Sequence, residues 1–232
     1  MLFLIFGKID YLNLLPFDIF IKRYARSSRF KQTLHYKRGV PSALNRAFAS
    51  RNIDAAFISS ITAQKCKHFG IGIVAKKEVL SVLAIPSDSY KKDSESATSN
   101  LLAQVLDIDA EVIIGDKALQ YYYRGGEHID LGKLWSDKTS LPFVFALLCT
   151  HNNKEEIKKI SRNFSKKRIF IPYYIIKKES QKRDLSIEQV KHYLKHISYS
   201  VGTKELRGYK RFLHEAKNRQ ILPSLREIRM GK

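Results

Sequence analysis

The chain has 232 residues, of which 44% are hydrophobic and 28% are charged. This balance is typical of soluble globular proteins and argues against wholesale disorder, and the length suffices for one large domain or two small ones. The formal net charge of +20 raises the question of nucleic-acid or membrane-surface binding. No recognisable nucleic-acid motif accompanies the charge. We therefore interpret it as a basic solvated surface that also attracts anionic metabolites, and expect neither nucleic acid nor membrane as a partner.

The start of the chain reads as a buried strand rather than as a targeting segment. Residues 1–6 are apolar, but no longer apolar region and no small-residue cleavage site follows them. No stretch approaches the roughly 20 apolar residues of a membrane span. The two cysteines, Cys66 and Cys149, do not indicate a disulfide scaffold, and the seven histidines lack metal-ligand spacing. These features predict a cytoplasmic protein without a metal site.

The first part of the chain alternates strand and helix patterns. In order, the sequence predicts a strand over 1–6, a helix from Pro16 to about 26, a strand over 33–36, a helix over 40–48, and strands over 53–60, 70–75 and 79–85. The rest predicts a helix over 99–106, a strand over 110–115, a strand over 141–149, a helical region from 153, a capped helix over 186–195 and a last helix over 204–220. Strands that alternate with helices indicate a parallel α/β sheet.

The charge changes sign along the chain. Residues 1–84 hold 14 Lys and Arg against 4 Asp and Glu, and residues 142–232 hold 22 against 8. Residues 85–141 hold 6 against 10, and an uncharged strand pattern lies at each end of this stretch. We therefore predict a larger α/β lobe from 1–84 plus 142–232 and a smaller inserted lobe from 85–141. Two chain crossings would form a hinge, with a ligand cleft between the lobes.

Two motifs carry groups that suit a small anion. Tyr11 and Asn13 follow the first strand, where parallel-sheet proteins place ligand contacts, although Asn13 would equally serve to cap the helix that starts near Pro16. The segment Ser96-Ala-Thr-Ser99 precedes a helix, where hydroxyls and free backbone N–H groups suit a carboxylate or phosphate. Ordinary helix capping by one of these hydroxyls is the alternative.

Three further polar residues stand at or near strand ends. Ser59 ends an apolar strand pattern, Ser81 lies inside a predicted hinge strand, and Asp116 follows a strand–turn–helix junction. Each would contact a ligand or satisfy a local backbone group, and Asp116 would serve as a helix cap. The tyrosine clusters at 121–123 and 173–174 are interpreted as packing groups.

Taken together, seven segments in order resemble the chorismate dehydratase family. They are Gly7-Lys-Ile-Asp-Tyr-Leu-Asn-Leu-Leu-Pro16, Val40-Pro-Ser-Ala-Leu-Asn45, Asp54-Ala-Ala-Phe-Ile-Ser-Ser60, Ser96-Ala-Thr-Ser99, Ile114-Gly-Asp-Lys-Ala-Leu119, Asp130-Leu-Gly-Lys-Leu-Trp135 and Leu141-Pro-Phe-Val-Phe-Ala146. The resemblance runs to about residue 150 and continues more weakly through Tyr199-Ser-Val-Gly202 and the last helix. The segment 87–96 looks shorter than in the family, and the Lys-rich stretch 153–183 diverges from it.

The resemblance implies an α/β, two-lobed type II periplasmic-binding-protein-like fold and the dehydration of chorismate to 3-enolpyruvylbenzoate in the futalosine route to menaquinone, without a cofactor. It assigns the central catalytic position to Asn13. Because the motifs contain few bases, we expect catalysis by positioning, with a substrate carboxylate as the base. Asp10 and Asp116 are the alternative acids or bases.

The same resemblance implies how the other residues would be used. Ser96, Thr98 and Ser99 would hold one substrate carboxylate, and Ser59 and Ser81 would line the cleft together with Tyr11. The alternative function is a non-catalytic small-anion-binding protein of the same fold.

Overall fold

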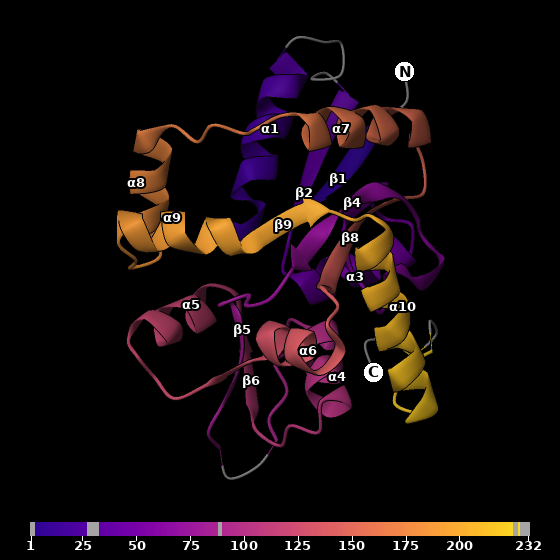
Figure 1. Ribbon diagram of the computed structural model, residues 1–232. Helices are drawn as coiled ribbons and strands as arrows, with labels where there is room; N and C mark the ends of the chain where they lie inside the picture. Colours follow the sequence, from indigo (N-terminus) through magenta and orange to yellow (C-terminus); the bar gives the residue numbers. More distant parts are fainter. Residues whose placement is uncertain (1–2, 27–32, 88–89, 225–226, 228–232) are drawn as a thin grey trace.

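The computed structural model describes residues 3–26, 33–87, 90–224 and 227. Two β-sheets organise this part of the chain (Figure 1). The larger has the strand order β2-β1-β3-β8-β4-β9, and the smaller has the order β6-β5-β7. We call the six-stranded sheet with its helices the larger lobe, and the three-stranded sheet with α4, α5 and α6 the smaller lobe.

The bounds of the elements follow the chain. The strands are β1 (Leu4–Lys8), β2 (Leu34–Arg38), β3 (Ala55–Ser59), β4 (Lys67–Ala75), β5 (Val82–Ile85), β6 (Glu111–Ile114), β7 (Ile129–Asp130), β8 (Phe143–Thr150) and β9 (Ile197–Ser200). The helices are α1 (Leu15–Arg26), α3 (Pro41–Ala49), α4 (Ala97–Val105), α5 (Gly115–Tyr123), α6 (Leu131–Thr139), α7 (Lys154–Lys166), α8 (Tyr173–Lys182), α9 (Ile187–His196) and α10 (Thr203–Asn218), with short 3-10 turns η1 (Leu12–Leu14) and η2 (Ala63–Lys65).

The prediction of a parallel sheet is wrong for most of the strand pairs. Strand β1 pairs in parallel with β2 and β3, but β8 is antiparallel to β3 and β4, and β4 is antiparallel to β9. The named strands of the smaller sheet are antiparallel as well. The physical reason is the inserted lobe: the chain leaves the larger sheet after β4 and re-enters it in β8 from the side of the smaller lobe. A re-entering strand of this kind runs opposite to the strands around it.

Two segments connect the lobes. Residues 76–81 lead from β4 to β5, and the Asp130 carboxylate fixes their end by accepting hydrogen bonds from the backbone N–H groups of Val79 (2.9 Å) and Leu80 (2.7 Å). Residues 140–142 lead back from α6 to β8. Because β5 pairs with β6 and β7, the first crossing lies before β5 and not at residue 84. The division of the chain into independent lobes stays a prediction.

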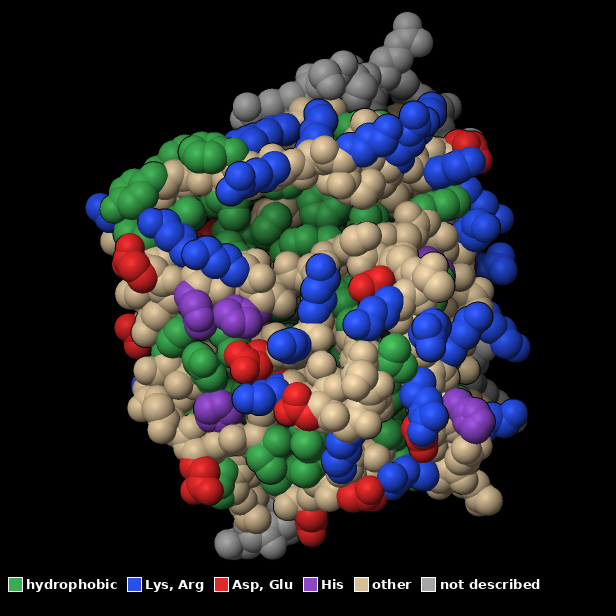
Figure 2. Space-filling model, in the orientation of Figure 1, with side chains coloured by type: hydrophobic (Ala, Val, Ile, Leu, Met, Phe, Trp, Pro, Cys, Tyr) green, Lys and Arg blue, Asp and Glu red, His purple; other side chains and the backbone are tan. Residues whose placement is uncertain are grey.

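Helices cover the larger sheet and join it to the smaller lobe. Helix α3 packs against β3, α7 packs against β4, and α10 contacts both β8 and α4. Gly208 permits this last contact, since a Cβ atom there would lie 2.1 Å from the backbone oxygen of Pro142. Figure 2 shows Lys and Arg side chains along the upper part of the visible face and down the side of α10, whereas Asp and Glu side chains are more frequent below. This distribution agrees with the change of charge sign along the sequence.

Most predicted elements exist with shifted bounds. The strand predicted over 1–6 runs over Leu4–Lys8, and its first two residues lie outside the described part, as do residues 88 and 89 of the segment 87–96. The strand predicted over 79–85 is limited to its last four residues. Strand β9 lies in a region that the sequence predicts to be helical. It forms because it pairs with β4 at the edge of the sheet, a contact that local patterning does not reveal.

Candidate functional site

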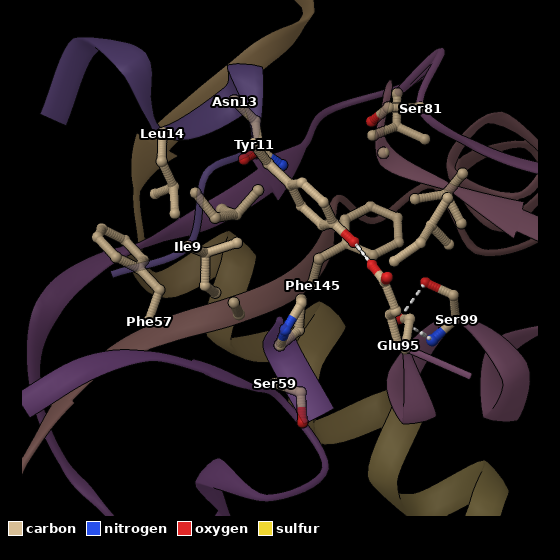
Figure 3. A pocket seen from close by; sticks show the side chains of 18 residues that line it. Ile9, Tyr11, Asn13, Leu14, Phe57, Ser59, Ser81, Glu95, Ser99 and Phe145 are labelled. Carbon is tan, nitrogen blue, oxygen red and sulfur yellow. Dashed lines mark hydrogen bonds between the residues drawn. The ribbon is translucent and has the colours of Figure 1, made fainter. Parts of the chain in front are cut away.

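A pocket lies where the loop after β1, the first crossing and the start of α4 meet (Figure 3). Its free volume is about 80 Å³, far below the roughly 300 Å³ of typical small-molecule sites. The free space between the lining side chains is therefore too small for a typical small-molecule ligand. Its lining is mainly apolar, with polar groups in small clusters, and includes Ile9, Leu14, Phe57, Ile73, Val79, Val82, Ile114 and Phe145.

The loop after β1 places Tyr11 and Asn13 on the pocket wall. The loop is stabilised by a turn in which the N–H of Leu14 donates to the Tyr11 carbonyl over 3.0 Å. The hydroxyl of Tyr199, on β9, donates to the Asn13 carbonyl over 2.5 Å. Burial raises the pKa of Tyr199 far above its ordinary value, so this hydroxyl stays protonated and available as a donor. These two hydrogen bonds hold the backbone around Asn13, and the backbone in turn sets the direction in which the Asn13 side chain points.

Ser81 is hydrogen-bonded by a tyrosine that sequence reasoning missed. Tyr193 is 1% exposed, and its hydroxyl donates to Ser81 Oγ over 2.9 Å. Helix α9, which carries Tyr193, also packs against η1, which contains Asn13. Burial raises the pKa of Tyr193, so it remains a neutral phenol. No local pattern in α9 marks Tyr193 as functional, because its role depends on α9 packing against η1.

Ser59 occupies another part of the wall with a second missed partner. Asn45 Nδ2 donates to Ser59 Oγ over 2.9 Å, and Asn45 Oδ1 accepts from the Ser59 N–H over 3.1 Å. Ser59 Oγ also lies 3.0 Å from the hydroxyl of Thr62. Ser59 therefore lines the pocket, while most of its hydrogen-bonding capacity is used within the larger lobe. Asn45 belongs to the segment Val40–Asn45, one of the seven that resemble the family, but the sequence analysis assigned it no role.

The start of α4 contributes Ser96 and Ser99. Ser96 caps the helix: its Oγ accepts from the Ser99 N–H over 3.1 Å and donates to Ser99 Oγ over 2.7 Å. Glu95 precedes them and accepts a hydrogen bond from the Tyr11 hydroxyl across the pocket (Figure 3). Burial, followed by the Glu95 contact, raises the pKa of Tyr11 well above its usual range. Glu95 is the carboxylate that the sequence interpretation of a base-poor cleft overlooked.

Thr98 does not line the pocket. It is 1% exposed, its hydroxyl lies 3.3 Å from Ser60 Oγ, and it accepts from the Ile61 N–H over 3.4 Å. The helical periodicity of α4 explains this outcome, since residues 96 and 99 share a face that residue 98 leaves. Thr98 instead connects the smaller lobe to the end of β3.

Asp116 and Asp10 lie outside the pocket and belong to an ion-pair cluster around Arg183. The Arg183 side chain is 3% exposed, and its Nε lies 2.8 Å from Asp116 Oδ2 and its Nη2 3.5 Å from Asp10 Oδ1. Glu179 and Lys182 complete the cluster by pairing with Arg183 and Asp10 respectively. The predicted ligand contact of Asp116 and the alternative acid–base roles of both residues therefore do not match their positions.

The pKa directions in this cluster follow from burial and charge. Burial raises the pKa of Asp116, against the opposing effect of Arg183. The hydrogen bond from Lys182 lowers the pKa of Asp10. Burial opposes ionisation of Arg183, but Asp116 and Glu179 outweigh it and raise the Arg183 pKa. The cluster ties the loop after β1 and the segment after α8 to α5 of the smaller lobe.

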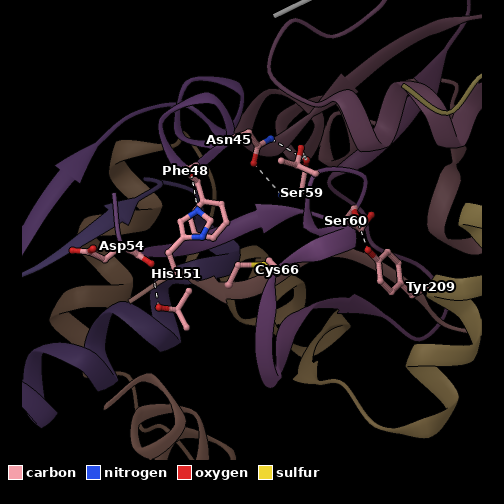
Figure 4. Close-up of a disulfide and its surroundings, with 11 residues drawn as sticks. Asn45, Phe48, Asp54, Ser59, Ser60, Cys66, His151 and Tyr209 are labelled. Carbon is pink, nitrogen blue, oxygen red and sulfur yellow. Dashed lines mark hydrogen bonds between the residues drawn. A yellow bond between two sulfur atoms is a disulfide. The ribbon is translucent and has the colours of Figure 1, made fainter. Parts of the chain in front are cut away.

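The cysteines form a disulfide, contrary to the sequence expectation. Cys66 and Cys149 are joined with a Cα–Cα distance of 5.7 Å (Figure 4). They are 83 residues apart in sequence, and only the antiparallel pairing of β4 with β8 brings them together. Asn45 and Ser59 lie in the same region of the larger lobe (Figure 4).

No three His, Cys, Asp or Glu side chains among the described residues are arranged to hold a metal ion. In the same part of the chain, no helix combines the length and apolar character that crossing a bilayer requires.

The chain resembles known proteins in both sequence and fold. A family model described as menaquinone biosynthesis matches residues 79–218. A chorismate dehydratase from Campylobacter jejuni subsp. jejuni is 47% identical over 218 residues, which cover 92% of this chain and 98% of the relative. The chain belongs to the chorismate dehydratase family. The family predicted from the seven segments is thereby confirmed.

Solved structures with low sequence identity share the fold. A protein from Archaeoglobus fulgidus superposes with a TM-score of 0.67 at 14% identity, covering 94% of this chain and 97% of that one. The alkanesulfonate-binding protein SsuA from Xanthomonas axonopodis pv. citri superposes with a TM-score of 0.60 at 12% identity, covering 96% and 94%. A Candida albicans protein described as having the generic periplasmic binding protein fold gives 0.57 at 12% identity, covering 100% and 95%. These likenesses confirm the predicted α/β, periplasmic-binding-protein-like fold.

Proposed function

We propose that this protein is an enzyme, a carbon–oxygen lyase that dehydrates chorismate to 3-enolpyruvylbenzoate and water in menaquinone biosynthesis. The observation that carries the proposal is the 47% identity to a chorismate dehydratase over 92% of the chain. The pocket supports it, because it combines apolar walls for a six-membered ring with hydroxyl and amide donors for carboxylates.

The reaction removes a ring hydroxyl and a ring proton, which together leave as water, and the ring becomes aromatic. Aromatisation drives the reaction, so the protein has to orient the substrate and assist the movement of the proton. Asn13 is the proposed catalytic residue: its amide would hold the leaving hydroxyl or the substrate carboxylate that accepts the proton. Tyr199 and Tyr193 would act as positioning residues, since Tyr199 donates to the Asn13 carbonyl and α9, which carries Tyr193, packs against η1.

The remaining lining residues would bind the substrate. Tyr11, Ser96 and Ser99 lie around one end of the pocket, and their donors suit a carboxylate. Ser59 and Ser81 would line the cleft beside the ring. A pocket with about 80 Å³ of free volume has to widen to admit chorismate, so we expect the lobes to move apart before binding and to close again afterwards.

Incubation of the purified chain with chorismate tests the proposal, with 3-enolpyruvylbenzoate detected by liquid chromatography and mass spectrometry. Asn13→Ala should lower kcat about 100-fold or more, the loss typical of removing one oriented donor. The matched control is Asn52→Ala, since Asn52 is exposed and lies outside the pocket. Near-normal turnover by Asn13→Ala would refute the role of Asn13. Saturable chorismate binding without product would favour the alternative of a small-anion-binding protein.

We also propose that the protein works in the cytoplasm, where a metabolic intermediate such as chorismate would be available. Disulfides persist mainly in oxidising compartments, so a cytoplasmic location predicts that Cys66 and Cys149 are largely thiols in the cell. Thiol labelling of the protein in freshly lysed cells, with acid quenching, tests this point. Complete protection of both cysteines from the label would contradict a reducing location.

A further inference from the structure

Tyr11 and Glu95 form a bridge across the pocket. Tyr11 follows β1 of the larger sheet, whereas Glu95 precedes α4 of the smaller lobe, and the Tyr11 hydroxyl donates to Glu95 Oε2 (Figure 3). The Tyr11 ring lies against Gly115, where a Cβ atom would come within 3.1 Å of the ring. This hydrogen bond links the loop after β1 to the segment before α4, so it breaks if these two segments move apart.

The backbone that carries Glu95 is firmly held. The Glu95 N–H donates to Asp93 Oδ1 over 2.8 Å, and the fully buried Asp93 side chain pairs with Lys117 over 2.5 Å. The Asn100 side chain accepts from the Asp93 N–H over 2.9 Å and donates to the Asp93 carbonyl over 2.7 Å. The turn before α4 therefore fixes where the Glu95 side chain starts.

The carboxylate of Glu95, by contrast, is held by a single neutral donor. Among the described residues, no Lys, Arg or His lies within ion-pair distance of it, and none of the pocket-lining residues described is a Lys or Arg. When an exposed or half-buried carboxylate accepts a hydrogen bond from one phenol, water can replace that phenol as the donor. Displacing the Glu95 carboxylate from the pocket therefore breaks one hydrogen bond, from the Tyr11 hydroxyl.

We propose that Glu95 is an internal competitor for the ligand carboxylate. In the structure the Glu95 carboxylate accepts the hydrogen bond of the Tyr11 phenol. When the lobes open, a carboxylate of the incoming ligand takes the place of Glu95 at this donor. Binding is then an exchange of one anion for another at the same donor, and Glu95 moves into solvent. This inference rests on the proposed function for the nature of the ligand, an aromatic-sized ring with two carboxylates.

The exchange has two consequences for the site. Glu95 weakens binding, because its hydrogen bond has to break and its charge repels the ligand. It also favours anionic ligands, since a neutral analogue gains too little from Tyr11 to displace a carboxylate. Glu95 would thus be a residue that sets affinity and specificity rather than one that reacts.

Isothermal titration of the full chain with isophthalate, a non-reacting ring with two carboxylates, tests the proposal. We expect Glu95→Gln to bind isophthalate roughly fivefold to tenfold more tightly than the unmodified chain, because hydrogen bonds to charged groups are about 1 kcal/mol stronger than neutral ones. Glu95→Ala should bind at least as tightly as Glu95→Gln. The matched control is Glu111→Gln, which removes one negative charge from the same lobe outside the pocket and should change affinity less than twofold. Neutral isophthalamide should bind weakly to the unmodified chain and more tightly to Glu95→Ala, in which no carboxylate has to be displaced from Tyr11.

A double-mutant cycle separates competition from a general effect of charge. With Tyr11→Phe the contested donor is gone, so adding Glu95→Gln should change isophthalate affinity less than twofold. Equal or weaker binding by both Glu95 variants, or an absence of binding in every chain, would overturn the proposal.

Chorismate turnover gives an independent readout. Glu95→Gln should lower KM severalfold and leave kcat within about threefold. A collapse of kcat at unchanged KM would make Glu95 a proton acceptor and overturn the competitor role. If the unmodified chain did not convert chorismate, the proposed function would fail, while the isophthalate titrations would still decide the role of Glu95.

Discussion

Replacement of Arg183 by Met is the sharpest test of how the loop after β1 is held. Arg183 is 3% exposed and pairs with Asp116, Asp10 and Glu179. Arg183→Met keeps much of the side-chain volume but removes the charge. Asp10 retains Lys182 as a partner, whereas Asp116 and Glu179, with side chains 30% and 17% exposed, lose their cation.

The expected loss of stability follows from these two stranded carboxylates. A hydrogen bond to a charged group contributes about 1.5–3 kcal/mol, and breaking a buried pair by removing one partner costs about 3–5 kcal/mol. We therefore expect Arg183→Met to lower the free energy of unfolding by about 3–5 kcal/mol at pH 7. Lys182→Met is the control, because the Lys182–Asp10 pair is largely exposed and should contribute less than about 1 kcal/mol.

The pH dependence gives a second readout with a definite sign. Burial already raises the pKa of Asp116, and Arg183 opposes this effect. Without Arg183 the Asp116 pKa should rise further, so the stranded charge is present at neutral pH and is neutralised as the pH falls through that pKa. The stability gap between the variant and the unmodified chain should therefore be largest at pH 7 and shrink at acidic pH.

Urea denaturation followed by circular dichroism at pH 7 and pH 5 measures both effects. A loss below about 1 kcal/mol at pH 7 would show that the cluster is not a buried unit. A gap that grows on acidification would refute the assignment of the cost to Asp116.

Three other changes test separate features. Gly115→Ala should cost about 1–2 kcal/mol, because φ is +66° and the new methyl meets the Tyr11 ring, and isophthalate titration should show weaker binding. Reduction of Cys66–Cys149 should cost about 4–5 kcal/mol by loop-closure entropy, and equal melting temperatures with and without reductant in disulfide-bonded protein would contradict this. Gly208→Ala should cost about 1–3 kcal/mol by overpacking, measured by urea denaturation, and an unchanged midpoint would show that α10 moves freely.

The sequence by itself determined the family, the fold class and most of the local elements. Capping and periodicity located α1 and α9 because those signals lie within a few residues of each other. The segments Tyr11–Asn13 and Ser96–Ser99 gave most of the pocket donors, because ligand groups stand at strand ends and helix starts in this class of fold.

The tertiary structure decided what depends on contacts between distant segments. It placed Tyr193 against Ser81, paired Asp116 with Arg183, and joined Cys66 to Cys149, all through pairs more than 60 residues apart. It also brought Glu95 to Tyr11 and so placed a carboxylate in a cleft predicted to be poor in acids and bases. Such pairings leave no local signal, because neither partner's propensity or spacing depends on the other until the lobes pack together.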